Sequence, residues 1–129
     1  MNDISIKKVV NKNVHEVVDQ IKAELSNSGF GTLTDINLKE KFKEKLDIEY
    51  ENYRILGACN PAFARQVLDR NKSVGLFLPC SIVVYEKEDK VYIEMQKPTF
   101  LSKIFEDEKI EEIAQEVEKR LIKVIESIK

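Results

Sequence analysis

The chain of 129 residues has no tryptophan, one histidine and only two cysteines, four glycines and three prolines. So little glycine and proline excludes collagen-like and low-complexity chains, and a hydrophobic share of 43% excludes intrinsic disorder. The longest largely apolar run, from Val74 to Tyr85, spans about a dozen residues, whereas a membrane-spanning helix needs about 20. We therefore expect a globular protein with no transmembrane segment and no membrane partner.

The charged residues are nearly balanced, with 21 Lys and Arg against 23 Asp and Glu and a formal net charge of -2. Proteins that bind nucleic acid draw much of their affinity from clustered Lys and Arg. We therefore expect no nucleic-acid partner. The length fits a single domain over residues 1–129.

The first residues and the cysteine count bear on the compartment. Met1 to Ser5 lacks the basic start and apolar core of a secretory signal. Two cysteines are too few for a secreted scaffold held by disulfides. We expect a cytoplasmic protein.

Hydrophobic periodicity predicts alternating strands and helices. Segments rich in branched and aromatic residues predict strands over residues 4–10, 30–36, 53–59, 81–86 and 91–96. Apolar residues spaced three and four apart predict helices over residues 14–28, 38–46, 61–70 and 107–128. Asn13 and Asn60 are placed to cap two of these helices, and Gly29 to end the first. A hairpin with several helices favours a two-layer α+β domain with a mainly antiparallel sheet packed by helices.

The apolar stripes of the helices indicate which faces pack. We interpret the stripe of the last helix as core rather than as a coiled-coil seam, because its heptad register slips after Val117. The helix over residues 38–46 has a narrow stripe and many charges, as a lid would. The helix over residues 61–70 is expected to bury Phe63, Ala64, Val67 and Leu68.

Residues 98–105 are unusually apolar for a connection between two elements. They either cap the core or form a partner surface, and we favour the core. Dimerisation through this segment or through a sheet edge is the alternative.

The two cysteines flank the helix over residues 61–70. Cys59 precedes the cap residue Asn60, where the positive end of the helix dipole favours a thiolate, and Cys80 follows Pro79 at the start of a strand. A parallel return of the chain would leave the two thiols at opposite ends of the sheet. If residues 72–79 are extended, they carry the chain back to an antiparallel strand, and both thiols then lie at one edge.

Three interpretations of the cysteines stay open: small buried hydrophobic residues, a reactive or ligand-contacting thiol pair, and a structural disulfide. The sequence has no C-x-x-C, phosphate-binding glycine loop or nucleophile elbow. His15, on the flank of the first helix, would have to reach a cysteine to form a catalytic dyad. Two cysteines and one histidine on three separate elements form no metal-binding pattern. We therefore expect no metal and no cofactor, and favour a module that is not an enzyme.

The segments around both cysteines resemble a known family. The runs Gly57–Pro61 (GACNP) and Gly75–Cys80 (GLFLPC), the strand residues Ser81–Glu86 and the pair Gly29-Phe30 resemble the prokaryotic family named domain of unknown function 302 (DUF302). The resemblance extends from Val14 to Gln96. It implies a fold like that of the TATA-binding-protein class, with the order strand, helix, four strands, helix and two further helices inserted between strands. It also implies a homodimer. It implies no activity and no DNA binding, because fold does not fix function.

Two hypotheses follow for the function. The first is a small binding or sensing module with a pocket at the sheet edge around Cys59, Asn60, Phe77, Leu78 and Cys80. Thiol chemistry, such as carrying sulfur or responding to oxidants, is its sharpest form. The second is a structural or interaction protein that acts through a homodimer surface, with both cysteines in the core.

Overall fold

The computed structural model describes residues 4–129, and residues 1–3, part of the start that lacks a secretory pattern, lie outside this range. The elements follow in the order β1 (Ser5–Val10), α1 (Val14–Asn27), β2 (Gly31–Asn37), α2 (Leu38–Leu46), β3 (Tyr53–Cys59), α3 (Pro61–Arg70), the 3-10 helix η1 (Lys72–Phe77), β4 (Cys80–Lys87), β5 (Lys90–Gln96), the 3-10 helix η2 (Pro98–Lys103) and α4 (Glu108–Ser127). Strand, helix, four strands and helix follow one another, with α2 inserted after β2 and α3 after β3, as the resemblance implies.

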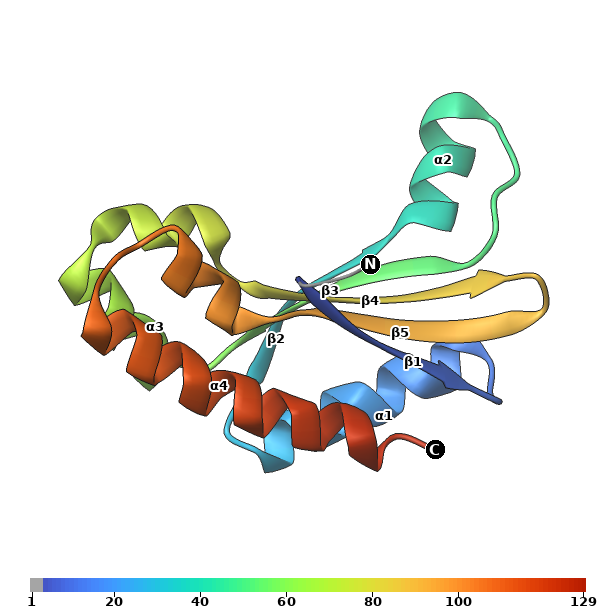
Figure 1. Ribbon diagram of the computed structural model, residues 1–129. Coiled ribbons are helices and arrows are strands. Elements are labelled where there is room, and N and C mark those ends of the chain that lie inside the picture. Colours follow the sequence, from blue (N-terminus) through green and yellow to red (C-terminus); the bar gives the residue numbers. More distant parts are fainter. Residues whose placement is uncertain (1–3) are drawn as a thin grey trace.

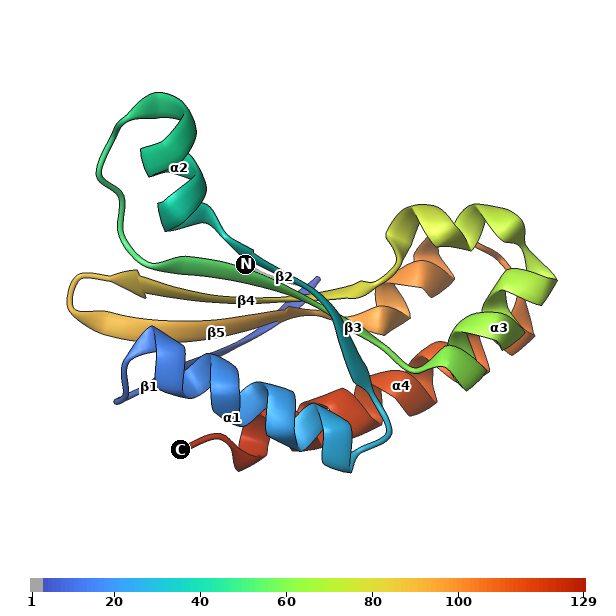
Figure 2. The same ribbon diagram turned by 180° about the vertical axis from the view of Figure 1, so that it is seen from behind.

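The strands form one five-stranded sheet in the order β1-β5-β4-β3-β2, and every neighbouring pair is antiparallel. Figure 1 shows α1 and α4 across the same face of this sheet, and Figure 2 shows the arrangement from behind. This architecture confirms the predicted two-layer α+β class. Among residues 4–129, no helix is both long enough and apolar enough to cross a bilayer.

The core lies between the sheet and the pair α1 and α4. Alternation along β5 turns Val91, Ile93 and Met95 toward the helices, and all three are buried. The predicted stripes of both helices are buried as well: Val14, Val17, Val18, Ile21 and Leu25 of α1, and Ile110, Ile113, Ala114, Val117, Leu121, Val124 and Ile125 of α4, with Ile128 just beyond. Each large side chain removed from water contributes about 1.5–3 kcal/mol, so these stripes hold the two layers together.

Local polar contacts set the ends of the helices. The side chain of Asn13 accepts a hydrogen bond from the Glu16 amide at the start of α1, and Gly29, just after this helix, has a φ of +83°. At the far end of α4, Lys8 of β1 donates from Nζ to the carbonyls of Ile125, Glu126 and Ile128. This ammonium satisfies carbonyls that lack a helical partner, and it ties the C-terminal helix to an edge strand.

One prediction about a connection is wrong. Residues 72–79, expected to be extended, begin with η1, because the Asn71 side chain accepts from the Ser73 amide at 2.9 Å and starts a new turn. The hairpin turn between β4 and β5 lies at residues 87–90, between the two predicted strands. Glu88 and Asp89, with φ values of 52° and 66°, turn the chain alone, and the strands lengthen to Lys87 and Lys90.

The predicted burial of α3 is also wrong in part. Val67 is buried, whereas Phe63, Ala64 and Leu68 are half-buried. The reason is the position of α3 beyond the end of the sheet, where it packs on α4 and η1 rather than on the strands (Figure 1).

The helix α2 and the 3-10 helix η2 differ in how they pack. α2 has no buried residue, contacts β3 and projects from the sheet on the face opposite to α1 and α4 (Figure 1). It is not a core element, as expected, and we name it the arm. In η2, Pro98 and Leu101 are buried, so this part of the apolar connection joins the core, while Ile104 just after it is 42% exposed.

Candidate functional site

The two cysteines lie at the same end of the sheet. β3 and β4 are antiparallel, and their register sets Ala58 opposite Cys80, with Cys59 next along β3. Of the two chain paths that the sequence leaves open, the structure has the antiparallel one, which brings both thiols to one edge of the sheet. The chain makes its return through α3 and η1.

A cavity of about 40 Å³ lies at this end of the sheet, and we name it the corner cavity. Its walls come from β3, β4, α3, η2 and α4, together with Phe30 just before β2. Four of the predicted site residues line it: Cys59, Asn60, Leu78 and Cys80. One water needs about 10–15 Å³ by this measure, so the corner cavity is a real gap in the packing.

The fifth predicted residue, Phe77, does not line the corner cavity. Its ring meets Phe105 edge to face, with centroids 5.8 Å apart, and it borders a smaller cavity of about 10 Å³. Cys80, Pro98 and Leu101 line both cavities. Phe77 is therefore a neighbour of the site on the far side of Cys80.

Asn60 positions the start of α3 at the rim of the corner cavity. Its Oδ1 accepts hydrogen bonds from the amides of Ala62 and Phe63 at 3.1 and 3.2 Å. Pro61 follows at the first helical position, where the missing N–H costs nothing. The sequence Cys59-Asn60-Pro61 thus ends a strand and begins a helix within three residues, and this fixes Cys59 against the cavity.

Gly57 fixes the opposite side of the same corner. A Cβ at this position would lie 2.5 Å from Pro79 Cγ and 2.5 Å from Thr34 Oγ1. Only glycine lets Pro79 close over β3 at this distance. Pro79 directly precedes Cys80, so this contact sets where Cys80 enters β4.

Both cysteines are free thiols, and burial raises the pKa of each. For Cys80, burial followed by the charge of a nearby Cys59 thiolate raises the pKa to about 11. A raised pKa disfavours the thiolate, whereas the position of Cys59 at the helix terminus predicts a lowered pKa. At neutral pH the corner cavity therefore presents protonated sulfur, which behaves as a small hydrophobic group with a weak donor.

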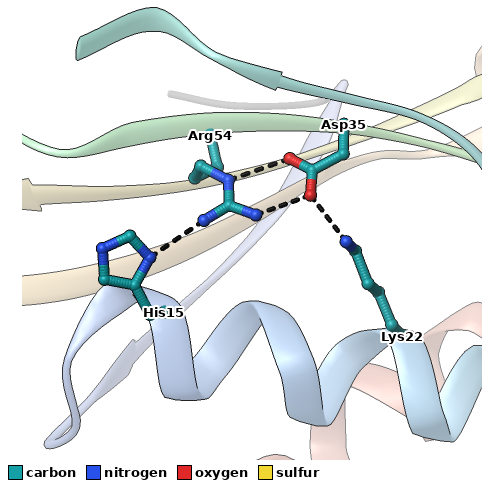
Figure 3. Close-up of polar contacts among 4 residues, drawn as sticks. All are labelled: His15, Lys22, Asp35 and Arg54. Atoms are coloured by element: carbon teal, nitrogen blue, oxygen red, sulfur yellow. Dashed lines mark hydrogen bonds and ion pairs between the residues drawn. The ribbon is translucent and has the colours of Figure 1, made fainter. Parts of the chain in front are cut away.

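His15 lies too far along the sheet to serve the cysteines. Figure 3 shows its ring beside Arg54, with Nδ1 3.0 Å from the Arg54 Nη1 atom. Arg54 comes five positions before Cys59 on β3, which corresponds to about 17 Å along a strand. The dyad of His15 with a cysteine is therefore excluded.

The remaining contacts in Figure 3 join α1 to β2 and β3. Asp35 accepts from Arg54 Nε at 2.8 Å and from Lys22 Nζ at 2.6 Å. The hydrogen bond from Arg54, opposed by burial and assisted by Lys22, lowers the pKa of Asp35 to about 2. Because both carboxylate oxygens of Asp35 accept hydrogen bonds from these two cations, we interpret the cluster as a structural clamp between α1, β2 and β3. Among residues 4–129, no group of three or more His, Cys, Asp or Glu side chains is placed to hold a metal ion.

The wall contributed by α4 was not foreseen from the sequence. Ile113, Ala114 and Val117 of α4 line the corner cavity and face Ala64 and Val67 of α3 across it. The signal in the sequence is the small size of the two alanines, each at an apolar position of its helix. Two small side chains at a helix contact leave space that two leucines would fill.

These observations define a two-layer α+β domain with an apolar corner cavity beside two thiols. The sequence model of the family described as "Domain of unknown function DUF302" matches residues 6–128, and the chain belongs to this family. A crystal structure of an uncharacterized conserved DUF302 protein from Bacillus stearothermophilus is 34% identical, has a TM-score of 0.91 and covers 98% of this chain and 99% of its own. The predicted family is thus confirmed. No curated protein matches the chain.

Proposed function

We propose that this protein is a small binding module that takes an uncharged, mainly apolar ligand into the corner cavity. The observation that carries this proposal is a gap in the packing lined almost wholly by apolar side chains, with two thiols and Asn60 at its edge. No charged side chain within the described residues 4–129 lines it. A charged ligand would lose its hydration without compensation there, whereas an apolar one would gain contacts.

The protonated thiols favour the binding form of this proposal over thiol chemistry. A nucleophilic or sulfur-carrying cysteine works as a thiolate. The raised pKa of Cys80, about 11, leaves very little thiolate at neutral pH. Cys59 and Cys80 then serve as soft, polarizable contacts for the ligand.

Xenon is a suitable first probe, because it is apolar, uncharged and small. We expect dissolved xenon to shift the methyl NMR signals of Val67, Leu78 and Val117, which line the corner cavity, and to leave those of Val9, an exposed residue, unchanged. Substitution Ala114→Leu fills the space and should abolish the shifts.

The matched control is Ala23→Leu, which adds the same side chain at an exposed position of α1. If Ala114→Leu destabilises the fold, Ala64→Leu fills the cavity from the half-buried side. The proposed site would be refuted if the xenon-induced shifts of wild type persisted in both Ala114→Leu and Ala64→Leu. The absence of any shift in wild type would refute it as well.

A second candidate function is assembly into a homodimer through the sheet face opposite to α1 and α4. On this face Tyr53, Tyr85 and Tyr92 stand side by side on β3, β4 and β5, with stacked rings whose centroids are 5.2 and 5.4 Å apart. Ile36 of β2, 41% exposed, continues the apolar surface. A surface of this composition resembles the aromatic centre of a protein interface.

The arm α2 and the sheet edges favour face-to-face assembly over edge pairing. Leu46 at the end of α2 is exposed, as are Ile48 and Tyr50 after it. The arm lies on the sheet face opposite to α1 and α4 (Figure 2), and strand alternation turns the three tyrosines to this face. The edge strand β2 has an irregular register between Thr32 and Thr34, which hinders strand addition. The arm of one copy would then lie against the tyrosine face of the other.

Sedimentation velocity tests this second candidate. Val83→Lys places a charge on the tyrosine face between β3 and β5, and it should convert a dimer to monomer without unfolding the chain. Leu76→Lys, at a residue of η1 that is 83% exposed, is the control. A wild-type protein that stays monomeric at high concentration would contradict this candidate.

A further inference from the structure

The corner cavity is much smaller than a usual ligand site. Its volume is about 40 Å³, whereas pockets for small molecules measure about 300–1,000 Å³. Any ligand of more than a few atoms therefore needs one wall to move. The walls from β3 and β4 are fixed by sheet hydrogen bonds, and α4 is fixed by its buried stripe.

The wall formed by α3 is the least anchored. Val67 is the one buried residue among its ten, and the helix lies beyond the end of the sheet (Figure 1). η1 packs against it, since a Cβ at Gly75 would lie 3.6 Å from Leu68 Cδ2. α3 and η1 can therefore move together.

Two arginine contacts hold α3 to α4, one near each end of the helix. Near its start, the guanidinium of Arg120 lies over the Phe63 ring, 4.9 Å from the centroid. At its end, Arg70 Nε donates to Asp107 Oδ2 at 3.0 Å. Ala64 and Val67 face the corner cavity between these two contacts.

Both contacts are partly exposed, with Arg70 52% and Arg120 44% accessible. Exposed ion pairs and cation–π contacts each shift an equilibrium by about two- to fivefold. The two contacts are therefore strong enough to bias a closed position and weak enough to release it.

We infer that α3 is a hinged cover of the corner cavity, that its separation from α4 admits the ligand, and that Arg70 and Arg120 hold it closed. The identity of what enters rests on the proposed function, whereas the motion does not. The hinges are Asn60, between β3 and α3, and the turn from η1 to β4 at Leu78, both with extended backbone.

Alkylation of Cys80 measures the opening without any ligand. In a Cys59→Ala background, Cys80 is the single thiol, and it lines the cavity that α3 covers. When opening is fast relative to the reaction, the rate with iodoacetamide follows the open population. We expect the pair of substitutions Arg70→Met and Arg120→Met to raise this rate roughly fivefold.

Two matched controls isolate the α3 to α4 contacts. Arg65→Met removes an arginine of α3 that pairs within its own helix, with Asp69 at 3.7 Å. Glu116→Gln removes the ion pair of Arg120 at 2.9 Å and leaves its contact with Phe63. Both should leave the alkylation rate near that of the parent. Urea unfolding of each variant separates local opening from global unfolding.

The outcomes for the cover and for the proposed function are distinct. If the double variant reacts no faster than Arg65→Met, the hinged cover is overturned, whatever xenon does. If it reacts faster, and saturation with xenon slows the reaction in the parent, both ideas stand. A faster reaction that xenon leaves unchanged, with no xenon-induced methyl shift, supports the cover and overturns the proposed ligand site.

Discussion

Substitution Gly57→Ala tests the packing that forms the corner between β3 and Pro79. The added Cβ would sit 2.5 Å from two heavy atoms, Pro79 Cγ and Thr34 Oγ1, well inside normal contact distance. Neither atom is the end of a long flexible side chain, so β2 or the segment before β4 must shift. Overpacking of this kind costs about 1–3 kcal/mol.

Urea denaturation measures this cost directly. For a slope of about 2 kcal/mol per molar urea, a loss of about 2 kcal/mol lowers the midpoint by about 1 M. We expect the slope itself to stay unchanged, because the same surface is exposed on unfolding. The xenon-induced methyl shifts should also weaken, since Pro79 positions Cys80 at the cavity.

Gly31→Ala is the matched control, because Gly31 also lies in a strand and a Cβ there meets nothing within 4 Å. Alanine is easier to order than glycine, so this variant should equal or exceed wild type by up to about 1 kcal/mol. The reasoning is refuted if Gly57→Ala and Gly31→Ala have the same stability, since the two positions differ in what surrounds the new atom.

Two further predictions concern contacts away from the corner cavity. Asp35 has a folded pKa of about 2 against an unfolded value near 4, so its contribution is present above pH 4 and is lost as the pH falls toward 2. Asp35→Asn should cost about 1 kcal/mol of unfolding free energy at pH 7, after allowance for solvent screening. The urea midpoint of this variant should change less between pH 4 and 2 than that of wild type. An unchanged pH dependence would show that the clamp contributes nothing. Lys8→Met removes the ammonium that bonds carbonyls at the end of α4, and should cost about 1 kcal/mol in thermal unfolding. Lys12→Met is its control, because Lys12 donates to the side chain of Gln20 rather than to a helix end; equal losses in the two variants would contradict the role of Lys8.

The strands and long helices were predictable because their burial follows a strict period. The residues of α4 predicted to share one stripe are all buried, and β5 alternates as expected. The starts of α1 and α3 were predictable for a different reason, since Asn13 and Asn60 cap them through local hydrogen bonds. Such signals need only neighbours in the sequence.

The features that were missed depend on contacts between distant segments or on weak local signals. Phe63 and Leu68 have the spacing of a buried face, but α3 extends past the sheet and leaves them half-buried. η1 arises from one hydrogen bond at Asn71, which periodicity does not register. Phe77, the last residue of η1, lies on the far side of Cys80, and for that reason it does not line the corner cavity.

The candidate site was predictable only on the side that carries the cysteines. Cys59, Asn60, Leu78 and Cys80 were chosen for their chemistry and their places at element ends, and these four meet at one cavity. Its opposite wall, with Ala114, comes from a helix that begins 28 positions after Cys80. Which helix covers that end of the sheet depends on the packing of the whole chain.

The segment from Asn60 to Pro79 leaves the sheet beside Ala58 and returns beside Cys80, two residues that face each other across paired strands. A loop whose ends are held adjacent by the scaffold changes length at little entropic cost. The segment that covers the cavity, α3 with η1, can therefore change independently of the strands β3 and β4 beneath it. A relative with a different sequence or length between the equivalents of Asn60 and Pro79 would have a different cavity wall, and its strands would keep the same register.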